Sequence, residues 1–151
     1  MSVADPYRLQ RFVTAQAGAY ETALGELRRG QKESHWIWYV FPQVAGLGFS
    51  PTSEFYAIRS RDEALAYLRH ESLGPRLREC AQALLALEGR HINAILGTPD
   101  NLKLRSSMTL FAAVSPADTA FQAVLDKYFE GQPDGRTLVF LAGGGGGPRP
   151  A

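Results

Sequence analysis

Lys103 and Ser107 combine residue types and a spacing that could support chemistry. They lie four positions apart, so a helix over residues 100–111 would carry both on one face, among apolar side chains. A lysine on a mainly inward face has a lowered affinity for its proton. In that state it can act as a base, a Schiff-base nucleophile or an anion contact. We therefore predict that Lys103 and Ser107 are catalytic residues.

Both residues also have an ordinary structural explanation, which the sequence leaves open. Lys103 can lay its methylene groups along the edge of the core and keep its ammonium in water, paired with Asp100. Ser107 can donate its hydroxyl to the backbone carbonyl four residues earlier, as serines inside helices usually do.

A second candidate region is the segment 32–57, KESHWIWYVFPQVAGLGFSPTSEFYA, which holds both tryptophans beside polar side chains. Large aromatic rings next to convergent polar groups are typical of a ligand pocket. We interpret Trp36 and Phe41 as core anchors. Trp38 then remains as a surface on which a sugar, a base or a cation could stack. His35 is a third predicted catalytic residue, because its imidazole can transfer protons and read polar groups.

The glycine-rich stretch AGLGFS, residues 45–50, could hold an anion through its backbone amides, with a hydroxyl at the next helix start as a further donor. A plain turn is the alternative. The site hypothesis requires this segment to meet the helix that carries Lys103. The predicted ligand-binding residues are Lys32, Trp38, Gln43, Gly48, Ser50, Ser53 and Tyr56.

The remaining chain predicts a helical scaffold, because apolar residues recur at helical spacing. We predict an all-α, compact single-domain bundle of about six or seven helices with short loops, over residues 5–142. Asp5 and Pro6 fit a first helix start, Ser34 fits a cap before the aromatic segment, and Ser60 with Glu63 fits a capping box. Residues 136–142 fit a strand or a buried helix; a capping Asp134 favours the helix. Residues 143–151 predict a disordered Gly/Pro-rich tail.

Composition sets broad limits on function. Sixteen Lys and Arg against fifteen Asp and Glu in 151 residues give a net charge of +1, so nucleic-acid binding is not expected. One cysteine and three scattered histidines predict no metal site, and we expect no cofactor. Without a signal peptide or a long apolar run, we expect a cytoplasmic protein that does not enter a membrane. The oligomeric state is not predictable from these features.

Five motifs together resemble a known family: HWIWYVFPQ, AGLGFS, YAI at residues 56–58, EALAYLRH with LGPRL, and ILGTPDNLKLRSSMTLF. The chain is similar, over roughly residues 5–142, to the bacterial domain-of-unknown-function family 1810, which sometimes carries the misleading label calpastatin. The resemblance implies a small, mainly α-helical cytosolic protein and carries no established activity.

A looser, fold-level similarity is to the NADAR type of small helical proteins, which process ADP-ribose adducts and related N-glycosides. It implies a hydrolase in which an aromatic ring stacks a base or ribose and a lysine meets the phosphate or the anomeric carbon. Glu54 or Glu63 could act as acid or base, although Glu63 also fits its helix cap. The alternative is a non-catalytic module that binds a nucleotide-like or sugar-phosphate ligand, or another protein, at the same place.

Overall fold

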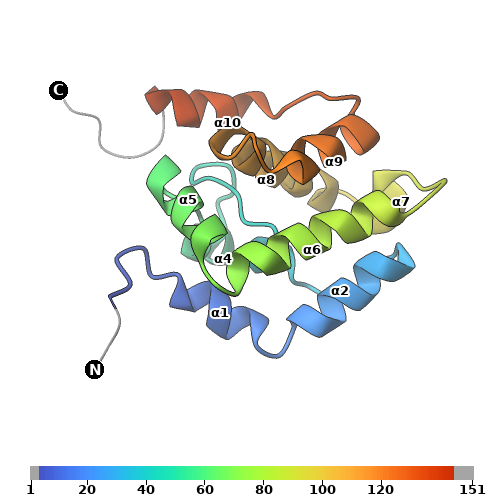
Figure 1. The fold of residues 1–151 in the computed structure, drawn as a ribbon, viewed down its shortest axis with the longest axis horizontal. Helices are drawn as coiled ribbons and strands as arrows, with labels where there is room; N and C mark the ends of the chain where they lie inside the picture. Colours follow the sequence, from blue (N-terminus) through green and yellow to red (C-terminus); the bar gives the residue numbers. More distant parts are fainter. Residues whose placement is uncertain (1–3, 145–151) are drawn as a thin grey trace.

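The computed structural model describes residues 4–144, and within them the chain is α-helical with no strand (Figure 1). The predicted all-α class is confirmed. The longer helices correspond to the predicted bundle, and short helical turns connect them. In chain order the elements are α1 (Gln10–Gln16), α2 (Tyr20–Arg29), α3 (Ile37–Val40), α4 (Pro51–Phe55), α5 (Arg61–Arg69), α6 (Leu73–Ala86), α7 (Ile92–Leu96), α8 (Asp100–Val114), α9 (Thr119–Phe129), α10 (Gly135–Val139) and a π-helical turn η1 (Phe140–Gly144).

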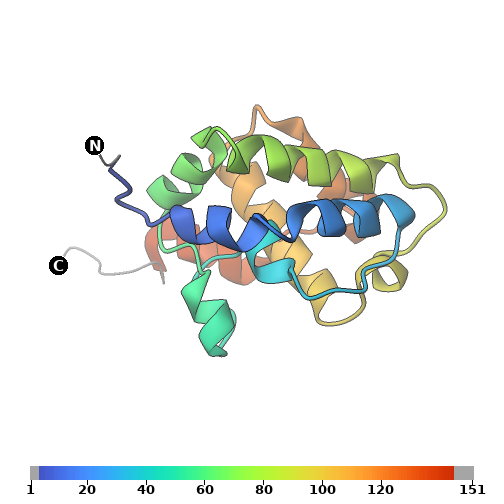
Figure 2. The same ribbon diagram turned by 90° about the horizontal axis from the view of Figure 1, so that it is seen from below.

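Helix α8 runs through the middle of the molecule and contacts α3, α5, α7, α9 and α10. Figures 1 and 2 show α1 and α2 following one another along one side, with α5 and α6 beside them. A row of buried aromatic rings joins these layers. Phe12 meets Tyr67 at 5.1 Å between ring centroids, Tyr67 meets Phe111 at 5.5 Å, and Phe111 meets Phe121 at 5.8 Å. The core therefore ties α1, α5, α8 and α9 together through side chains that are fully buried.

Local capping chemistry explains where several helices begin. Glu63 N donates to Ser60 Oγ at 3.0 Å, so Ser60 caps α5 as predicted, while Glu63 Oε1 accepts from Arg59 N at 3.0 Å rather than from the Ser60 amide of the predicted capping box. Asp134 caps α10 through Thr137 N, as predicted. The turn around residues 136–142 is accordingly helical.

One predicted boundary is wrong. The first helix begins at Gln10 rather than near Pro6, because Arg8 has φ +53°, outside helical geometry; the Asp5 carboxylate accepts from the backbone amides of Leu9 and Gln10 just after this turn. At the start of the predicted tail, Gly143 has φ +95°, which is not helical, although η1 extends to Gly144. Residues 145–151, the rest of that tail, lie outside the described residues.

An isolated pairing of two extended segments closes the loop that contains α4. Ala45 N donates to Ile58 O at 2.9 Å, and Ile58 N donates to Gln43 O at 2.9 Å. Val44 and Ile58 are both buried beside this pairing. Residues 46–57 are therefore held as a loop whose two ends are fixed on the core.

Candidate functional site

The aromatic segment and helix α8 meet, as the site hypothesis requires. Lys32 Nζ lies 2.8 Å from Asp100 Oδ2, and Lys103 Nζ lies 3.8 Å from Asp100 Oδ1. The Lys103 ammonium also lies 5.1 Å from the centroid of the Trp38 ring. We call Lys32, Trp38, Asp100 and Lys103 the lysine cluster. Two cations in it share one carboxylate.

Contacts within the protein hold the Lys32 side chain in place without a ligand. Its side chain is 7% exposed, its backbone amide donates to Ile95 O at 2.7 Å, and its ammonium donates to the Ser34 carbonyl. The ammonium also lies 5.0 Å from the Trp36 ring centroid. The pair with Asp100 is thus a largely buried link between the segment after α2 and the start of α8.

Glu26 on α2 organises the same segment, and sequence reasoning missed it. Its carboxylate is buried and accepts from Glu33 N at 2.8 Å, Ser34 N at 2.9 Å, Ser34 Oγ at 2.6 Å and Trp36 Nε1 at 2.8 Å. Burial alone would raise the pKa of this carboxyl, but the hydrogen bonds from these donors outweigh burial and lower the pKa to about 2. The sequence did carry a signal for this residue, because Glu26 lies three positions after Ala23 and so falls on the buried face of α2.

The predicted cap at Ser34 is wrong for this reason. The Ser34 hydroxyl donates to Glu26, and α3 begins at Ile37 without a side-chain cap. Trp36 and Phe41 are each 1% exposed and lie in the core, as interpreted from the sequence. Trp38 is half buried, and its Nε1 is buried without a hydrogen-bond partner among the described residues.

The predicted catalytic residues fall in different environments. The side chain of Lys103 is 22% exposed and shares Asp100 with Lys32, which agrees with the structural alternative. Ser107 is fully buried, and within residues 4–144 its hydroxyl has no partner, whereas its neighbour Ser106 bonds back to Leu102 O at 3.1 Å. The expected back-bond of Ser107 is therefore absent. His35 is exposed, and within the same range no hydrogen bond or ion pair joins its imidazole to another residue.

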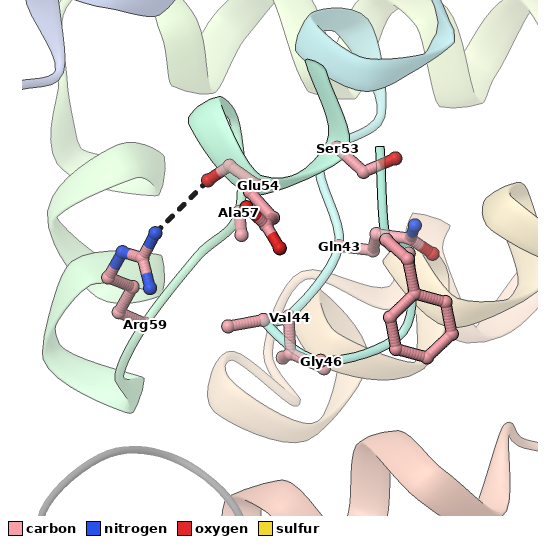
Figure 3. Close-up of a pocket in the computed structure, with 10 residues that line it drawn as sticks. Gln43, Val44, Gly46, Ser53, Glu54, Ala57 and Arg59 are labelled. Carbon is pink, nitrogen blue, oxygen red and sulfur yellow. Dashed lines mark hydrogen bonds between the residues drawn. The ribbon is translucent and has the colours of Figure 1, made fainter. Parts of the chain in front are cut away.

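A cavity of about 400 Å³ lies beside the glycine-rich stretch (Figure 3). We call it the loop pocket. Figure 3 shows Gln43 and Ser53 on one side and Arg59 on the other, where its guanidinium donates to the Glu54 carbonyl at 3.1 Å. The pocket thus joins the extended pairing to the short helix α4. Its lining residues are Gln43, Val44, Ala45, Gly46, Gly48, Phe49, Ser53, Glu54, Ala57 and Arg59.

Glycine is required at position 48 by close packing. A Cβ there would lie 2.6 Å from both Cβ and Oγ of Ser53, which is closer than real Cβ contacts. The next residue, Phe49, is 85% exposed, so a large aromatic ring stands at the pocket with little of its surface covered. Such an exposed ring is unusual for a side chain of this size.

The loop pocket takes in only part of the predicted ligand-binding set. Gln43, Gly48 and Ser53 line it. Ser50 instead caps α4, with Ser53 N donating to its hydroxyl at 3.1 Å, and Tyr56 packs on Phe12 with ring centroids 5.8 Å apart. None of the lysine cluster is among the lining residues, so the structure divides the one predicted site between two places.

The other groups that could carry chemistry are buried, scattered or already paired within the protein. Burial raises the pKa of the Cys80 thiol to about 12, so it remains protonated at neutral pH. Among residues 4–144 no group of three or more His, Cys, Asp or Glu is placed to hold a metal ion. In the same range no helix has both the length and the apolar character needed to cross a bilayer. Glu63, the alternative acid or base, is occupied by its helix cap and by Arg11 Nη2 at 2.7 Å.

These features define a small all-α protein whose polar groups collect around helix α8 and the loop before α5. The family model described as protein of unknown function (DUF1810) matches residues 6–141, and the chain belongs to this family. The membership predicted from the motifs is confirmed.

A solved structure supports the same assignment. The crystal structure of the conserved hypothetical protein Rv1873 from Mycobacterium tuberculosis is 52% identical, with a TM-score of 0.90. The match covers 91% of this chain and 99% of that one. A comparison with curated proteins finds no match. The similar proteins therefore support the fold and name no activity.

Proposed function

We propose that the protein binds a nucleotide-like anion in the loop pocket. The observation that carries this proposal is the exposed ring of Phe49 at a cavity that Arg59 and a glycine-rich backbone also line. Aromatic rings stack on nucleobases, and such stacking contributes about 1–3 kcal/mol per base. A solvent-exposed phenylalanine therefore gains from a ligand that covers it.

The polar groups of the pocket suit the remainder of such a ligand. The guanidinium of Arg59 can pair with a phosphate, and the side-chain amide of Gln43 can donate to and accept from a base or a ribose. Gly46 and Gly48 carry no side chain, so a ligand can approach the backbone of the loop closely. The lysine cluster lies outside the lining and has no direct role in this proposal.

Binding can be tested by thermal shift and calorimetry with ADP-ribose, ADP and ribose 5-phosphate. A ligand that binds only the folded protein stabilises it by RT ln(1 + [L]/Kd), where [L] is the free ligand concentration, so the melting temperature rises as ligand is added. Phe49→Ala should weaken ADP binding roughly tenfold, because it removes one stacking surface. Phe55→Ala is the matched control, since this ring is 47% exposed on α4 and does not line the pocket. The proposal fails if no compound in the series stabilises the protein, or if both variants bind alike.

A second candidate, hydrolysis of ADP-ribose adducts or related N-glycosides, is favoured by one observation: Glu54 lines the loop pocket. Its carboxylate could act as acid or base toward a glycosidic bond. Glu54→Gln separates the two functions, because the amide keeps the shape and loses the proton transfer. Hydrolysis predicts at least a hundredfold loss of product release with Kd nearly unchanged. Binding alone predicts no product release from either protein.

A further inference from the structure

A second cavity, about 340 Å³ in volume, lies where α7, the start of α8 and the end of α9 come together. We call it the basic cavity. It shares no lining residue with the loop pocket. Its lining includes Arg90, His91, Asn93, Asn101, Leu102 and Lys127.

The positive charges of this cavity are not neutralised by the protein. Arg90 Nη1 donates to Gly30 O at 3.0 Å, and Lys127 Nζ donates to Leu85 O at 2.7 Å and to Leu87 O. All three acceptors are carbonyls without a formal charge, which orient the cations without forming an ion pair. Within residues 4–144 neither cation forms an ion pair, and no carboxylate is among the lining residues. The cavity is therefore suited to an anion.

Asn101 supplies an independent sign of a missing partner. This residue is 9% exposed, and its Nδ2 donates to Asn93 Oδ1 at 2.6 Å. Its own Oδ1 is buried and has no hydrogen-bond partner among the described residues. A buried acceptor left unpaired costs free energy, so most such groups in folded proteins have a partner. A ligand with a hydroxyl or an N–H group could supply the donor.

We propose that the basic cavity binds a small organic anion that carries a hydrogen-bond donor and an apolar part. The anionic group faces Arg90 and Lys127, and the donor pairs with Asn101 Oδ1. The apolar part covers Leu102, which is 50% exposed, and Phe129. This proposal concerns a different site from the loop pocket and does not depend on the nucleotide proposal.

The probe is 4-hydroxybenzoate, which has a carboxylate, a ring and a hydroxyl, with benzoate as the matched ligand that lacks the donor. NMR titration of the protein should show saturable shifts of the side-chain amides of Asn93 and Asn101 and of the His91 ring. Because one neutral hydrogen bond is at stake, benzoate should bind about threefold to tenfold more weakly. No saturable shift, or equal binding of the two ligands, would overturn the proposal.

Variants keep the test independent of folding. Asn101→Asp retains the size of the side chain and adds a negative charge, so 4-hydroxybenzoate binding should be lost. Leu102→Glu places a carboxylate at an exposed position of the same cavity and should also abolish binding. Leu138→Glu is the matched control on α10, where the side chain is 42% exposed outside the cavity, and it should bind as the wild type does. Phe49→Ala should likewise have no effect. Normal binding by the Leu102→Glu protein would contradict the assignment.

Discussion

At the scale of single residues, the Glu26 carboxylate fixes the start of the aromatic segment. It accepts from two backbone amides, one hydroxyl and one indole, all within the segment 33–36. Lys32 lies immediately before this segment, and Trp36 is its last residue. The contact between the Lys32 ammonium and the Trp36 ring therefore depends on the Glu26 carboxylate. The arrangement of the lysine cluster therefore depends on a residue outside it.

Glu26 gives the stability of the protein a defined pH dependence. The pKa of this carboxyl is about 2 in the folded protein against an ordinary value of 4.5, so the ionised form is favoured by folding. Its contribution is complete above about pH 4.5 and is lost as the pH falls toward about 2. A shift of this size corresponds to about 3 kcal/mol.

Urea unfolding of the wild type and Glu26→Gln from pH 7 to pH 2 measures that contribution. The variant should be less stable by about 3 kcal/mol at pH 7, with a gap that narrows as the wild-type carboxyl is protonated. Glu33→Gln is the control, because Glu33 pairs with Arg29 on the surface and should contribute less than about 1 kcal/mol. A gap that stays constant with pH would contradict this origin.

Gly48 offers a second prediction at the residue scale. Gly48→Ala should destabilise the protein by about 1–3 kcal/mol and reshape the loop pocket, because the new Cβ collides with the side chain of Ser53. Adding Ser53→Gly removes both colliding atoms and should recover part of the loss, so the two changes are not additive. Thermal unfolding of the two single variants and the double variant measures the coupling, and full additivity would exclude the collision as the cause.

At the scale of elements, the ion pair between Lys32 and Asp100 joins α8 to the chain after α2. It is more buried than the neighbouring ion pair between Lys103 and Asp100. The side chain of Lys32 is 7% exposed and 2.8 Å from Asp100, whereas that of Lys103 is 22% exposed and 3.8 Å away. Removing one partner of a buried pair leaves the other charge unpaired. The two lysines therefore differ in their contribution to stability although they share one carboxylate.

Lys32→Met should lower the free energy of unfolding by about 3 kcal/mol, and Lys103→Met by less than about 1 kcal/mol. Asp100→Asn should resemble Lys32→Met, because it leaves the Lys32 ammonium buried without its carboxylate. Urea titration at neutral pH gives all three values. Equal losses for both lysines would show that the two ion pairs contribute alike.

The elements also show which features a sequence can reveal. Helices and the caps at Ser60 and Asp134 depend on residues a few positions apart, so their periodicity and spacing predicted them. The loop pocket depends on pairing between Val44 and Ile58, which no local pattern records. Glu26 was missed for a similar reason, since its partners reach it only after the chain turns back at Gly30, where φ is +76°. The contact between the segment that begins at Lys32 and α8 was a hypothesis at the level of sequence, and only the tertiary structure shows it.

At the scale of the whole molecule, the central helix α8 is far more buried than helix α4 at the loop pocket. Nine residues of α8 are buried, among them Leu104, Met108 and Phe111. Helix α4, which forms one wall of the loop pocket, has no buried residue. It is held by the Ser50 cap and by hydrogen bonds from Arg11 and Arg59 to its carbonyls. The proposed ligand site thus lies beside a helix whose local opening should cost little free energy.

Amide hydrogen exchange should reflect this difference. The slowest amides should lie in α8, whose exchange requires global unfolding, and those of residues 51–56 should exchange orders of magnitude faster through local opening. If the nucleotide proposal is correct, saturating ADP should slow exchange in residues 46–56 far more than in α8, because the ligand closes the locally open state by mass action. Exchange followed by mass spectrometry, with Phe49→Ala as the binding-deficient control, measures both effects. Equal protection of α4 and α8 without ligand would contradict the burial argument, and unchanged exchange of α4 with ADP would contradict binding at the loop pocket.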